Sequence, residues 1–580
     1  MANAKTAVTY TQKSLRFCLF IKFYRMYNLY LKSQYLSVFF LVSGCIKQGE
    51  FVAIIGPSGA GKTTFLVSLA GKCTLPHQGT VTLNGTNIKD LQVVEIMPQF
   101  EVYLESLKVI EHLIFMTEMK LGSSKSPTNR VFLDSLLQDL KLKALINTPI
   151  FGLSGGERRL LSLATSLLSD PQVLIADEPT TGLDSYNATL VILTLKKLAL
   201  SGKTIICSIH QPSCDLYKEF SSIMLMAEGK LLFHGSQDDC RAVFDRYTVI
   251  NLHCPLNYNP AEFYINAVSD RKRRYVENVI ENYKMSYECN AQTKHLTQRN
   301  WFTQLYLLLW RFSLTIKKNV KDHIIQLFIN IMISSLVIGT CYVGISGTTQ
   351  RGVQDIRGFL WLITSELSFS LSYNALYVFE SELALFKREA KLYRCSAYLV
   401  ARFLSCLPRC VIWTVTQIII VTVAVDLPNH LVTSLQFIAA LIVAGVAAIA
   451  YGLGMAAVFT SSGIMGDLMP CADLLLFLMS GAFLRISSIP VWLHPIKFLS
   501  HFYYTMDAVS NVYWRQIGEI ACPWNSTSAC IKDGTSVLIE NGYSSNFVLQ
   551  DGLGLISVTL LWLIVGYFGL KREEKKGYAF

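Results

Sequence analysis

Apolar residues are distributed unevenly along the chain. Residues 1–300 mix apolar and charged positions, whereas six later runs are almost wholly apolar, at 324–344, 356–378, 397–424, 432–459, 468–486 and 553–570. Each run has about the ~20 residues that a helix needs to cross a bilayer. The pattern predicts one soluble domain followed by an all-α domain with six membrane spans.

Two shorter apolar runs lie in the soluble half. "FVAII" (51–55) precedes the glycine-rich "GPSGAGKTTF" (56–65), and "VLIA" (173–176) precedes "DEP" (177–179). Short apolar runs that end in glycine or acidic residues are typical of buried parallel strands, and the first is followed by a predicted helix. The soluble domain is therefore predicted to be α/β.

Composition supports a membrane protein. The chain has 580 residues, of which 51% are hydrophobic, and a net charge of +11. No basic stripe interleaved with aromatic residues occurs in the soluble half, so a nucleic-acid partner is not expected. We predict no signal peptide, because Arg16, Lys22, Arg25 and Lys32 interrupt the apolar N-terminal stretch. The soluble domain is then expected in the cytosol, in agreement with the basic residues after the second span.

Residues 56–63 fit the pattern G-x-x-x-x-G-K-[ST]. Glycines let backbone N–H groups close around a phosphate, Lys62 is expected to reach the β- and γ-phosphates, and the Thr63 hydroxyl is expected to ligate Mg²⁺. The predicted ATP-binding residues here are Gly56, Pro57, Ser58, Gly59, Ala60, Gly61, Lys62, Thr63 and Thr64. The pattern predicts a P-loop, with ATP and Mg²⁺ as its ligands.

Asp177 and Glu178 follow the apolar run 173–176. At the end of a buried strand near a phosphate site, Asp177 is expected to hold the Mg²⁺ shell. Glu178 is expected to polarise the water that attacks the γ-phosphate.

"LSGGERRLLSLA" (153–164) offers a second set of backbone donors before a helix. A second phosphate cradle makes sense if it covers the nucleotide held by another subunit. With Gln99 in "IMPQFEVY", Asp184 in "TGLDS" and His210 in "CSIHQP", the motifs resemble the ATP-binding cassette (ABC) domain of ABC transporters over residues ~45–240. The resemblance implies that Ser154, Gly155 and Gly156 form the signature clamp and that Asp184 belongs to the nucleotide site. It also implies that His210 orients the γ-phosphate and that Gln99 senses it and assists Mg²⁺.

The order of domains resembles a half-transporter of the G subfamily, in particular the White, Scarlet and Brown group of eye-pigment transporters, with Brown the most similar. The residues that carry this resemblance include "PQFE" (98–101), "EHLIFM" (111–116), "TQRGVQD" (349–355) and "CIKDG" (530–534). It implies an ATP hydrolase coupled to transport that works as a dimer, with a White-like half-transporter as the favoured partner. The implied cargo is a small molecule of the guanine or pteridine class.

The expected domains follow from these motifs. They are an atypical N-terminal segment (1–42), a nucleotide-binding domain (43–264) that ends at "NPAEFY", a connector (265–300), an amphipathic elbow helix on the inner membrane surface (301–319), and a six-span domain (320–580) with an extracytosolic loop (487–550). Residues 1–42 do not resemble the family and offer no clear residue to stack on adenine. Leu160 departs from the usual signature, but it lies outside the anion cradle.

Charges within the membrane spans are candidates for function. Glu366 lies near the middle of the second span, Asp473 begins the fifth, and Arg409 lies inside the third. The family resemblance places Glu366 and Asp473 toward a substrate cavity, with Phe483 in the apolar plug above it. An internal ion pair between an acid and Arg409 is the structural alternative.

Cys522 and Cys530 lie in the loop 487–550, with the glycosylation sequon of Asn525 between them. We predict a disulfide between these cysteines and a glycan at Asn525; free thiols or a bond to a partner chain are the alternatives.

Other functions stay open at this stage: a homodimeric or differently paired exporter of lipids, urate or xenobiotics, and a regulatory subunit with little ATPase activity. Glu178 and His210 argue against the last, because a degenerate regulator is expected to lack one of them. The expected membrane is that of a pigment granule or another intracellular vesicle, or the plasma membrane.

Overall fold

The structure is a computed structural model. It describes residues 18–27, 37–38, 42–72, 77–83, 86–87, 94–99, 101–122, 126–245, 254–255, 258–269, 299–390, 392–425, 427–459, 462–481, 485–488, 490–522, 530–543 and 547–576. The chain divides into two compact units, one of residues 1–298 with 577–580 and one of residues 299–576.

The first unit is built on a six-stranded sheet in the order β11-β10-β4-β9-β8-β7. Its strands are β4 (Phe51–Ile55), β7 (Val94–Met97), β8 (Val173–Ala176), β9 (Thr204–Ser208), β10 (Ser222–Ala227) and β11 (Lys230–Gly235). All neighbours are parallel except β10 and β11. Because parallel strands are covered on both faces, β4, β8, β9 and β10 consist of buried residues, and this explains their mostly apolar sequences.

A second, antiparallel sheet contains β1 (Cys18–Tyr27), β2 (Ser37–Val38), β3 (Val42–Lys47), β5 (His77–Leu83) and β6 (Thr86–Asn87). Strand β1 pairs with both β3 and β5. The predicted domain start at residue 43 is therefore too late, since Cys18–Tyr27 belongs to this sheet. Aromatic and β-branched residues in β1 suit a strand, but the charges among them conceal it from a search for familiar motifs.

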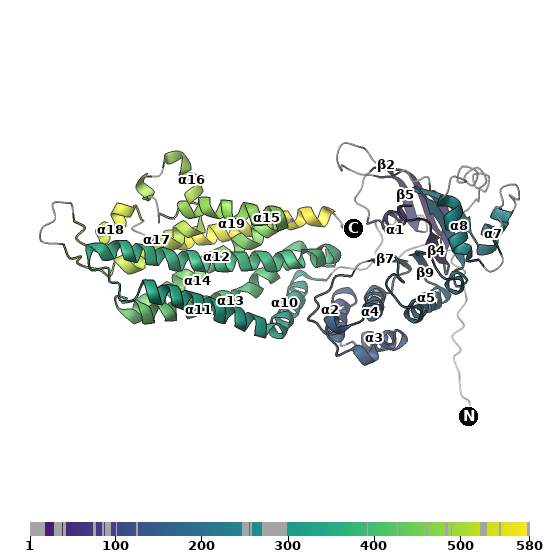
Figure 1. Cartoon of the computed structure of the whole chain (residues 1–580), viewed down its shortest axis with the longest axis horizontal. Helices are drawn as coiled ribbons and strands as arrows, with labels where there is room; N and C mark the ends of the chain where they lie inside the picture. Colours follow the sequence, from purple (N-terminus) through teal and green to yellow (C-terminus); the bar gives the residue numbers. More distant parts are fainter. Residues whose placement is uncertain are drawn as a thin grey trace, which may run out of the picture. The chain divides into compact units, whose positions relative to one another are not determined.

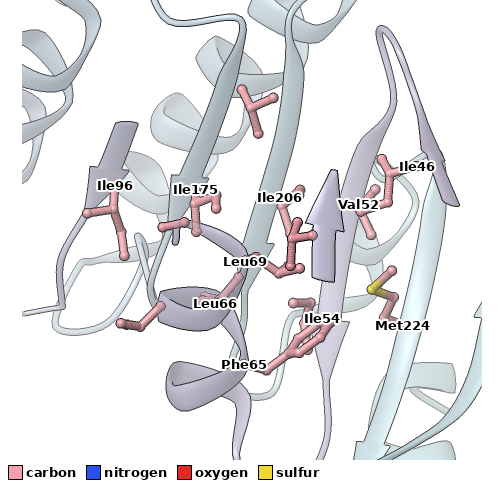
Figure 2. Close-up of a cluster of buried hydrophobic side chains, with 14 of the residues drawn as sticks. Ile46, Val52, Ile54, Phe65, Leu66, Leu69, Ile96, Ile175, Ile206 and Met224 are labelled. Carbon is pink, nitrogen blue, oxygen red and sulfur yellow. The ribbon is translucent and has the colours of Figure 1, made fainter. Parts of the chain in front are cut away.

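Helix α1 (Lys62–Leu69) packs on the six-stranded sheet. Figure 2 shows Phe65, Leu66 and Leu69 of α1 directed at side chains of the sheet, among them Ile54, Ile175 and Ile206. All of these side chains are at most 1% exposed. This core fixes the helix, and with it the glycine-rich loop that leads into it, at the end of β4.

The remaining helices of the first unit are α2 (Val109–Lys120), α3 (Pro127–Asp139), α4 (Gly155–Leu167), α5 (Ser185–Leu200), α6 (Cys214–Tyr217), α7 (Gln237–Asp245) and α8 (Pro260–Ser269). Helices α2, α3 and α4 lie together, next to the sheet (Figure 1). Helix α8 runs five residues beyond the predicted domain end at 264. The rest of the predicted connector, 270–298, lies outside the described residues.

The second unit is helical (Figure 1). Its longer helices are α10 (Trp301–Lys318), α11 (Val320–Cys341), α12 (Gln350–Glu389), α13 (Cys395–Ala424), α14 (His430–Val458), α15 (Ser462–Leu478), α17 (His501–Trp514) and α19 (Phe547–Lys576). Helix α10 coincides with the predicted elbow. It buries Leu307, Leu308 and Phe312 and exposes Phe302 and Tyr306, so apolar side chains occur on both of its sides.

Each of the six predicted spans overlaps one helix: α11, α12, α13, α14, α15 or α19. Among the described residues, three segments are long and apolar enough to cross a membrane, namely Cys395–Val423, His430–Val458 and Leu549–Lys575. Helix α15 has only 17 residues. Six crossings stay a prediction.

Helix α14 is the centre of the second unit and packs against α12, α13, α17 and α19. Two glycines allow this close packing. A Cβ on Gly452 would lie 2.2 Å from the Ser372 carbonyl oxygen of α12, and one on Gly454 would lie 2.9 Å from the Trp562 carbonyl oxygen of α19. Polar side chains on α12 and α19 are thereby brought into the interior of the bundle.

The described part of the segment 487–550, predicted to be a loop, is largely helical. It contains α16 (His494–Lys497), α17 and α18 (Gly534–Asn541), and every residue of α17 is buried. Aromatic residues in "HFYYTMDAVSNVYW" fill the space between α12, α14 and α19. The run was too short and too polar to be recognised as a buried helix by its hydropathy.

Candidate nucleotide site and polar sites of the helical unit

The glycine-rich loop joins β4 to α1, and its shape depends on the absence of side chains. A Cβ on Gly56 would lie 2.1 Å from the Met226 carbonyl oxygen of β10. Gly59 and Gly61 have φ angles of 78° and 91°, a left-handed conformation that favours glycine. The loop therefore presents backbone N–H groups at the start of α1, where the helix dipole favours an anion.

Lys62 is buried beneath this loop. Its Nζ donates to the carbonyl oxygens of Gly56 at 2.8 Å and Pro57 at 3.1 Å. Burial lowers the pKa of Lys62, and the charges of Glu178 and Asp177 oppose that change. The ammonium group is thus held in the loop, beside two carboxylates, where it can neutralise a phosphate.

Asp177 follows β8 and is brought next to Thr63, as the sequence predicted. Asp177 Oδ1 accepts from Thr63 Oγ1 at 3.2 Å and from Ser208 Oγ at 2.5 Å. Its Oδ2 is buried and has no hydrogen-bond partner in the described part of the chain. Burial raises the pKa of Asp177, and the bonds from Ser208 and Thr63 counteract part of this rise.

The free oxygen of Asp177 and the hydroxyl of Thr63 fit a magnesium ion. Carboxylate and hydroxyl oxygens are the ligands that Mg²⁺ prefers, and a buried orphan oxygen is expected to have a partner in the working protein. Gln99, the third predicted metal residue, lies against Glu178 and reaches the same region. These three residues could hold Mg²⁺ together with ATP.

Glu178 has a left-handed backbone conformation, with φ at 46°. Its N–H donates to Ser208 Oγ at 2.8 Å. Its carboxylate Oε2 accepts from Gln99 Nε2 at 2.7 Å and from Thr181 Oγ1 at 2.9 Å. The predicted base and the predicted sensor are therefore in direct contact.

His210 follows β9 and contacts the glycine-rich loop. Its Nε2 lies 3.1 Å from Ser58 Oγ. The segments after β4, β7, β8 and β9 thus bring Ser58, Lys62, Thr63, Gln99, Asp177, Glu178 and His210 to one end of the parallel sheet, as expected where the carboxyl ends of parallel strands meet.

The signature residues Ser154, Gly155 and Gly156 begin α4. Ser154 Oγ accepts from the Glu157 N–H at 3.3 Å, and Glu157 Oε2 accepts from the Ser154 N–H at 2.8 Å, so the two residues form a capping box. A Cβ on Gly156 would lie 3.0 Å from Asn187 Nδ2. Asn187 in turn donates to Asp184 Oδ1 at 2.6 Å. The signature and Asp184 are therefore linked to each other.

Sequence reasoning missed three residues of this site: Thr181, Ser208 and Arg159. Arg159 of α4 donates to the carbonyl oxygens of Pro98 at 2.9 Å and of Gln99, and pairs with Glu101 at 3.5 Å. It holds the segment that carries Gln99. The signal that could have indicated Ser208 is its position two residues before His210.

In the helical unit, Glu366 of α12 accepts from Ser334 Oγ of α11 and from Gln417 Nε2 of α13, the latter at 3.2 Å. Arg409 instead donates to Gln326 Oε1 at 3.2 Å. The alternative of an ion pair between Glu366 and Arg409 is therefore wrong for the described residues. Arg409 lies about two helical turns from Gln417 on α13, which separates the two side chains along the helix.

Asp473 of α15 is also buried. Its Oδ1 accepts from the Tyr451 hydroxyl at 2.7 Å, and the Tyr451 ring lies 5.3 Å from the His501 ring. Asp473 Oδ2 is buried without a hydrogen-bond partner in the described ranges. Phe483 lies outside the described residues.

Cys522 and Cys530 form a disulfide with an S–S distance of 2.13 Å. Gln350, at the start of α12, donates to the Ile531 carbonyl oxygen at 2.6 Å. Its Nε2 also lies 3.7 Å from Cys522 Sγ, so the disulfide lies next to the start of α12. Asn525, the predicted glycosylation site, lies outside the described residues.

Comparisons with known families match both units. The family model described as ABC transporter matches residues 40–181, and the one described as ABC-2 type transporter matches residues 303–514. The first range contains the glycine-rich loop, the signature and Asp177 with Glu178. The second contains α10 to α15 and α17.

Several relatives are similar over nearly the whole chain. Protein brown of Drosophila melanogaster is 29% identical, covering 96% of this chain and 95% of the relative. Protein white of the same species is 30% identical, covering 92% and 83%. Protein scarlet is 30% identical, covering 92% and 86%.

Proposed function

Since the chain belongs to the ABC transporters, as an ATP-hydrolysing half-transporter of the G subfamily, we propose that it moves guanine- or pteridine-type pigment precursors across a membrane. We propose further that it works as a heterodimer with a White-like half-transporter. The similarity to Brown, White and Scarlet favours both the cargo class and this pairing.

ATP binding is assigned to the glycine-rich loop. Its backbone N–H groups and the Lys62 ammonium face the phosphates, and Lys62 exchanges its bonds to the loop carbonyls for bonds to phosphate oxygens. Thr63, Gln99 and Asp177 would hold Mg²⁺, which neutralises charge on the phosphates when bound.

Hydrolysis is assigned to Glu178. To accept a proton from the attacking water, its carboxylate must give up the bond from Gln99 or Thr181. His210 is directed at the loop through Ser58 and orients the terminal phosphate. A movement of the segment held by Arg159 would shift Gln99 and release Glu178 from its hydrogen bond. The position of this segment would then control ATP hydrolysis.

The arrangement of motifs supports a dimer. One chain supplies a glycine-rich loop and Glu178 to one site, while the signature at Ser154 to Gly156 begins a separate helix, α4, next to Asn187. A signature from the partner would complete each nucleotide site.

The observation that supports the cargo class is the environment of Glu366. Its two oxygens each accept a bond from a neutral donor, Ser334 or Gln417. Guanine and pteridine rings present an amino group beside a ring N–H, and a carboxylate accepts these two donors side by side. Such a ring can replace the two neutral donors without separating an ion pair.

The test is ATP-dependent uptake of labelled guanine and of a labelled pteridine by vesicles. Vesicles contain this chain with a White-like partner, this chain alone, or the partner alone, and vesicles without ATP serve as the control. We expect robust uptake only with both chains. Robust transport by this chain alone, of lipid, urate or xenobiotic rather than purine, would overturn the proposal in favour of a homodimeric exporter.

A further inference from the structure

Ser208 ends β9 and lies between the two acidic residues of the nucleotide site. Its hydroxyl donates to Asp177 Oδ1 at 2.5 Å and accepts from the Glu178 N–H at 2.8 Å. Ser208 is 0% exposed and Asp177 is 1% exposed. Water therefore cannot replace either bond without entering the core.

A hydroxyl has one hydrogen to donate and lone pairs to accept with. The Ser208 hydroxyl uses both capacities on neighbouring residues, so the donor and acceptor directions together fix where Asp177 and Glu178 lie. A backbone N–H only donates and a backbone C=O only accepts, so neither could replace the hydroxyl in both bonds. An alanine would leave the Glu178 N–H and one oxygen of Asp177 without these partners.

We propose that Ser208 is a positioning residue for ATP hydrolysis, because one hydroxyl sets the side chain of Asp177 and the backbone of Glu178 at the same time. This inference rests on the proposed roles of Asp177 and Glu178. It extends them to a residue outside the glycine loop, the signature and the acidic pair.

The bond to Asp177 determines which oxygen is free. Because Ser208 and Thr63 both donate to Oδ1, Oδ2 is left without a bond in the described part of the chain. That oxygen is the one available to the magnesium shell. Without Ser208, the carboxylate is held by Thr63 alone and can rotate.

The bond to Glu178 supports a strained backbone. A left-handed conformation is uncommon for a residue with a side chain and persists only when its surroundings hold it. The Glu178 N–H, held by Ser208, directs the carboxylate toward Gln99 and Thr181. Loss of this bond is expected to move the Glu178 carboxylate and to leave its ability to accept a proton unchanged.

The test compares Ser208→Ala with a matched control on the same strand. Thr204 also lies on β9 and is 0% exposed, but its hydroxyl has no hydrogen-bond partner within the described residues. Thr204→Val removes that hydroxyl and keeps the shape. In the full heterodimer, we expect Ser208→Ala to lower the kcat for ATP roughly 10- to 100-fold, with KM changed less than about twofold. Thr204→Val should change neither.

Two measurements do not depend on turnover. Hydrogen–deuterium exchange of the peptide that contains Glu178 should speed up in Ser208→Ala but not in Thr204→Val, since only the former frees the Glu178 N–H. Binding of ATP without Mg²⁺ should be kept in both variants, which also shows that the domain is folded. Ser208→Thr, which keeps the hydroxyl, should restore most of the kcat.

The outcomes separate this inference from the proposed function. If Ser208→Ala keeps wild-type kcat, or if Ser208→Thr fails as fully as Ser208→Ala, the positioning role is wrong. Unchanged exchange at Glu178 would also overturn it. If Glu178→Gln itself turns over ATP like the wild type, the proposed roles of the acidic residues fail instead.

Discussion

The two units place their polar groups in different ways. In the first unit, Asp177 and Ser208 end neighbouring parallel strands and the glycine-rich loop ends the next, so their side chains meet at one end of the sheet. In the second unit, Glu366 lies within a 40-residue helix, and its partners come from α11 and α13. Strand ends bring residues together by topology, whereas positions within a helix meet only as packing allows.

This difference decides how much a motif can reveal. The motifs predicted that Thr63 and Asp177 both bind Mg²⁺, and the structure has a hydrogen bond between them. The sequence did not indicate that Arg409 faces Gln326 rather than Glu366, because this depends on the rotation and offset of α11, α12 and α13. We infer that the sequence predicts which residues form the site of the first unit. It does not predict which polar side chains of the second unit contact one another.

The largest expected effect tests the first unit. Glu178→Gln should lower steady-state ATP hydrolysis by roughly 10²- to 10⁴-fold and keep ATP binding, because the amide cannot accept a proton from water. Lys62→Ala should instead weaken binding itself. Both are measured on purified dimers, with nucleotide binding assayed in parallel. Unchanged turnover in Glu178→Gln would remove this residue from the mechanism.

The next effect concerns stability in the second unit. Arg311 Nη1 of α10 lies 2.7 Å from Glu389 Oε2 of α12, and both side chains are almost fully buried. Glu389→Gln leaves the guanidinium charge buried without its anion. We expect this to lower the free energy of unfolding by about 3–5 kcal/mol.

The control is an exposed pair in the first unit, Lys197 with Asp139, at 3.2 Å. Asp139→Asn should change stability by about 1 kcal/mol or less. Thermal unfolding of each variant in detergent gives the comparison. Equal melting temperatures for Glu389→Gln and Asp139→Asn would show that burial of the Arg311 pair carries no structural role.

The smallest effect tests the side of the membrane on which the disulfide ring lies. Asn525→Gln should abolish the change in gel mobility caused by glycosidase and leave ATP hydrolysis unaltered, because the site lies far in sequence from the nucleotide motifs. Asn187→Gln, in a sequon of the first unit, should keep the mobility change. A change that persists in Asn525→Gln would place the glycan, or the segment, elsewhere.

Sequence predicted the α/β character of the first unit and a helix over each apolar run of the second. It placed the start of the first unit too late, because strand β1 is defined by its pairing with β3 and β5 rather than by a motif. It also missed α17, whose aromatic and polar residues are buried only because three other helices surround it. Ser208 escaped notice for a similar reason: its importance lies in two tertiary hydrogen bonds.

One measurement tests the central claim, that ATP chemistry belongs to the first unit and cargo recognition to the second. ATP hydrolysis and uptake of labelled guanine are measured in the same heterodimer vesicles for wild type, Glu178→Gln and Glu366→Gln. The account predicts that Glu178→Gln loses both activities. Glu366→Gln, which replaces an acceptor oxygen with a donor, should lose most uptake and keep basal hydrolysis. Equal uptake with equal apparent affinity in Glu366→Gln would contradict the account and assign the cargo site to other residues.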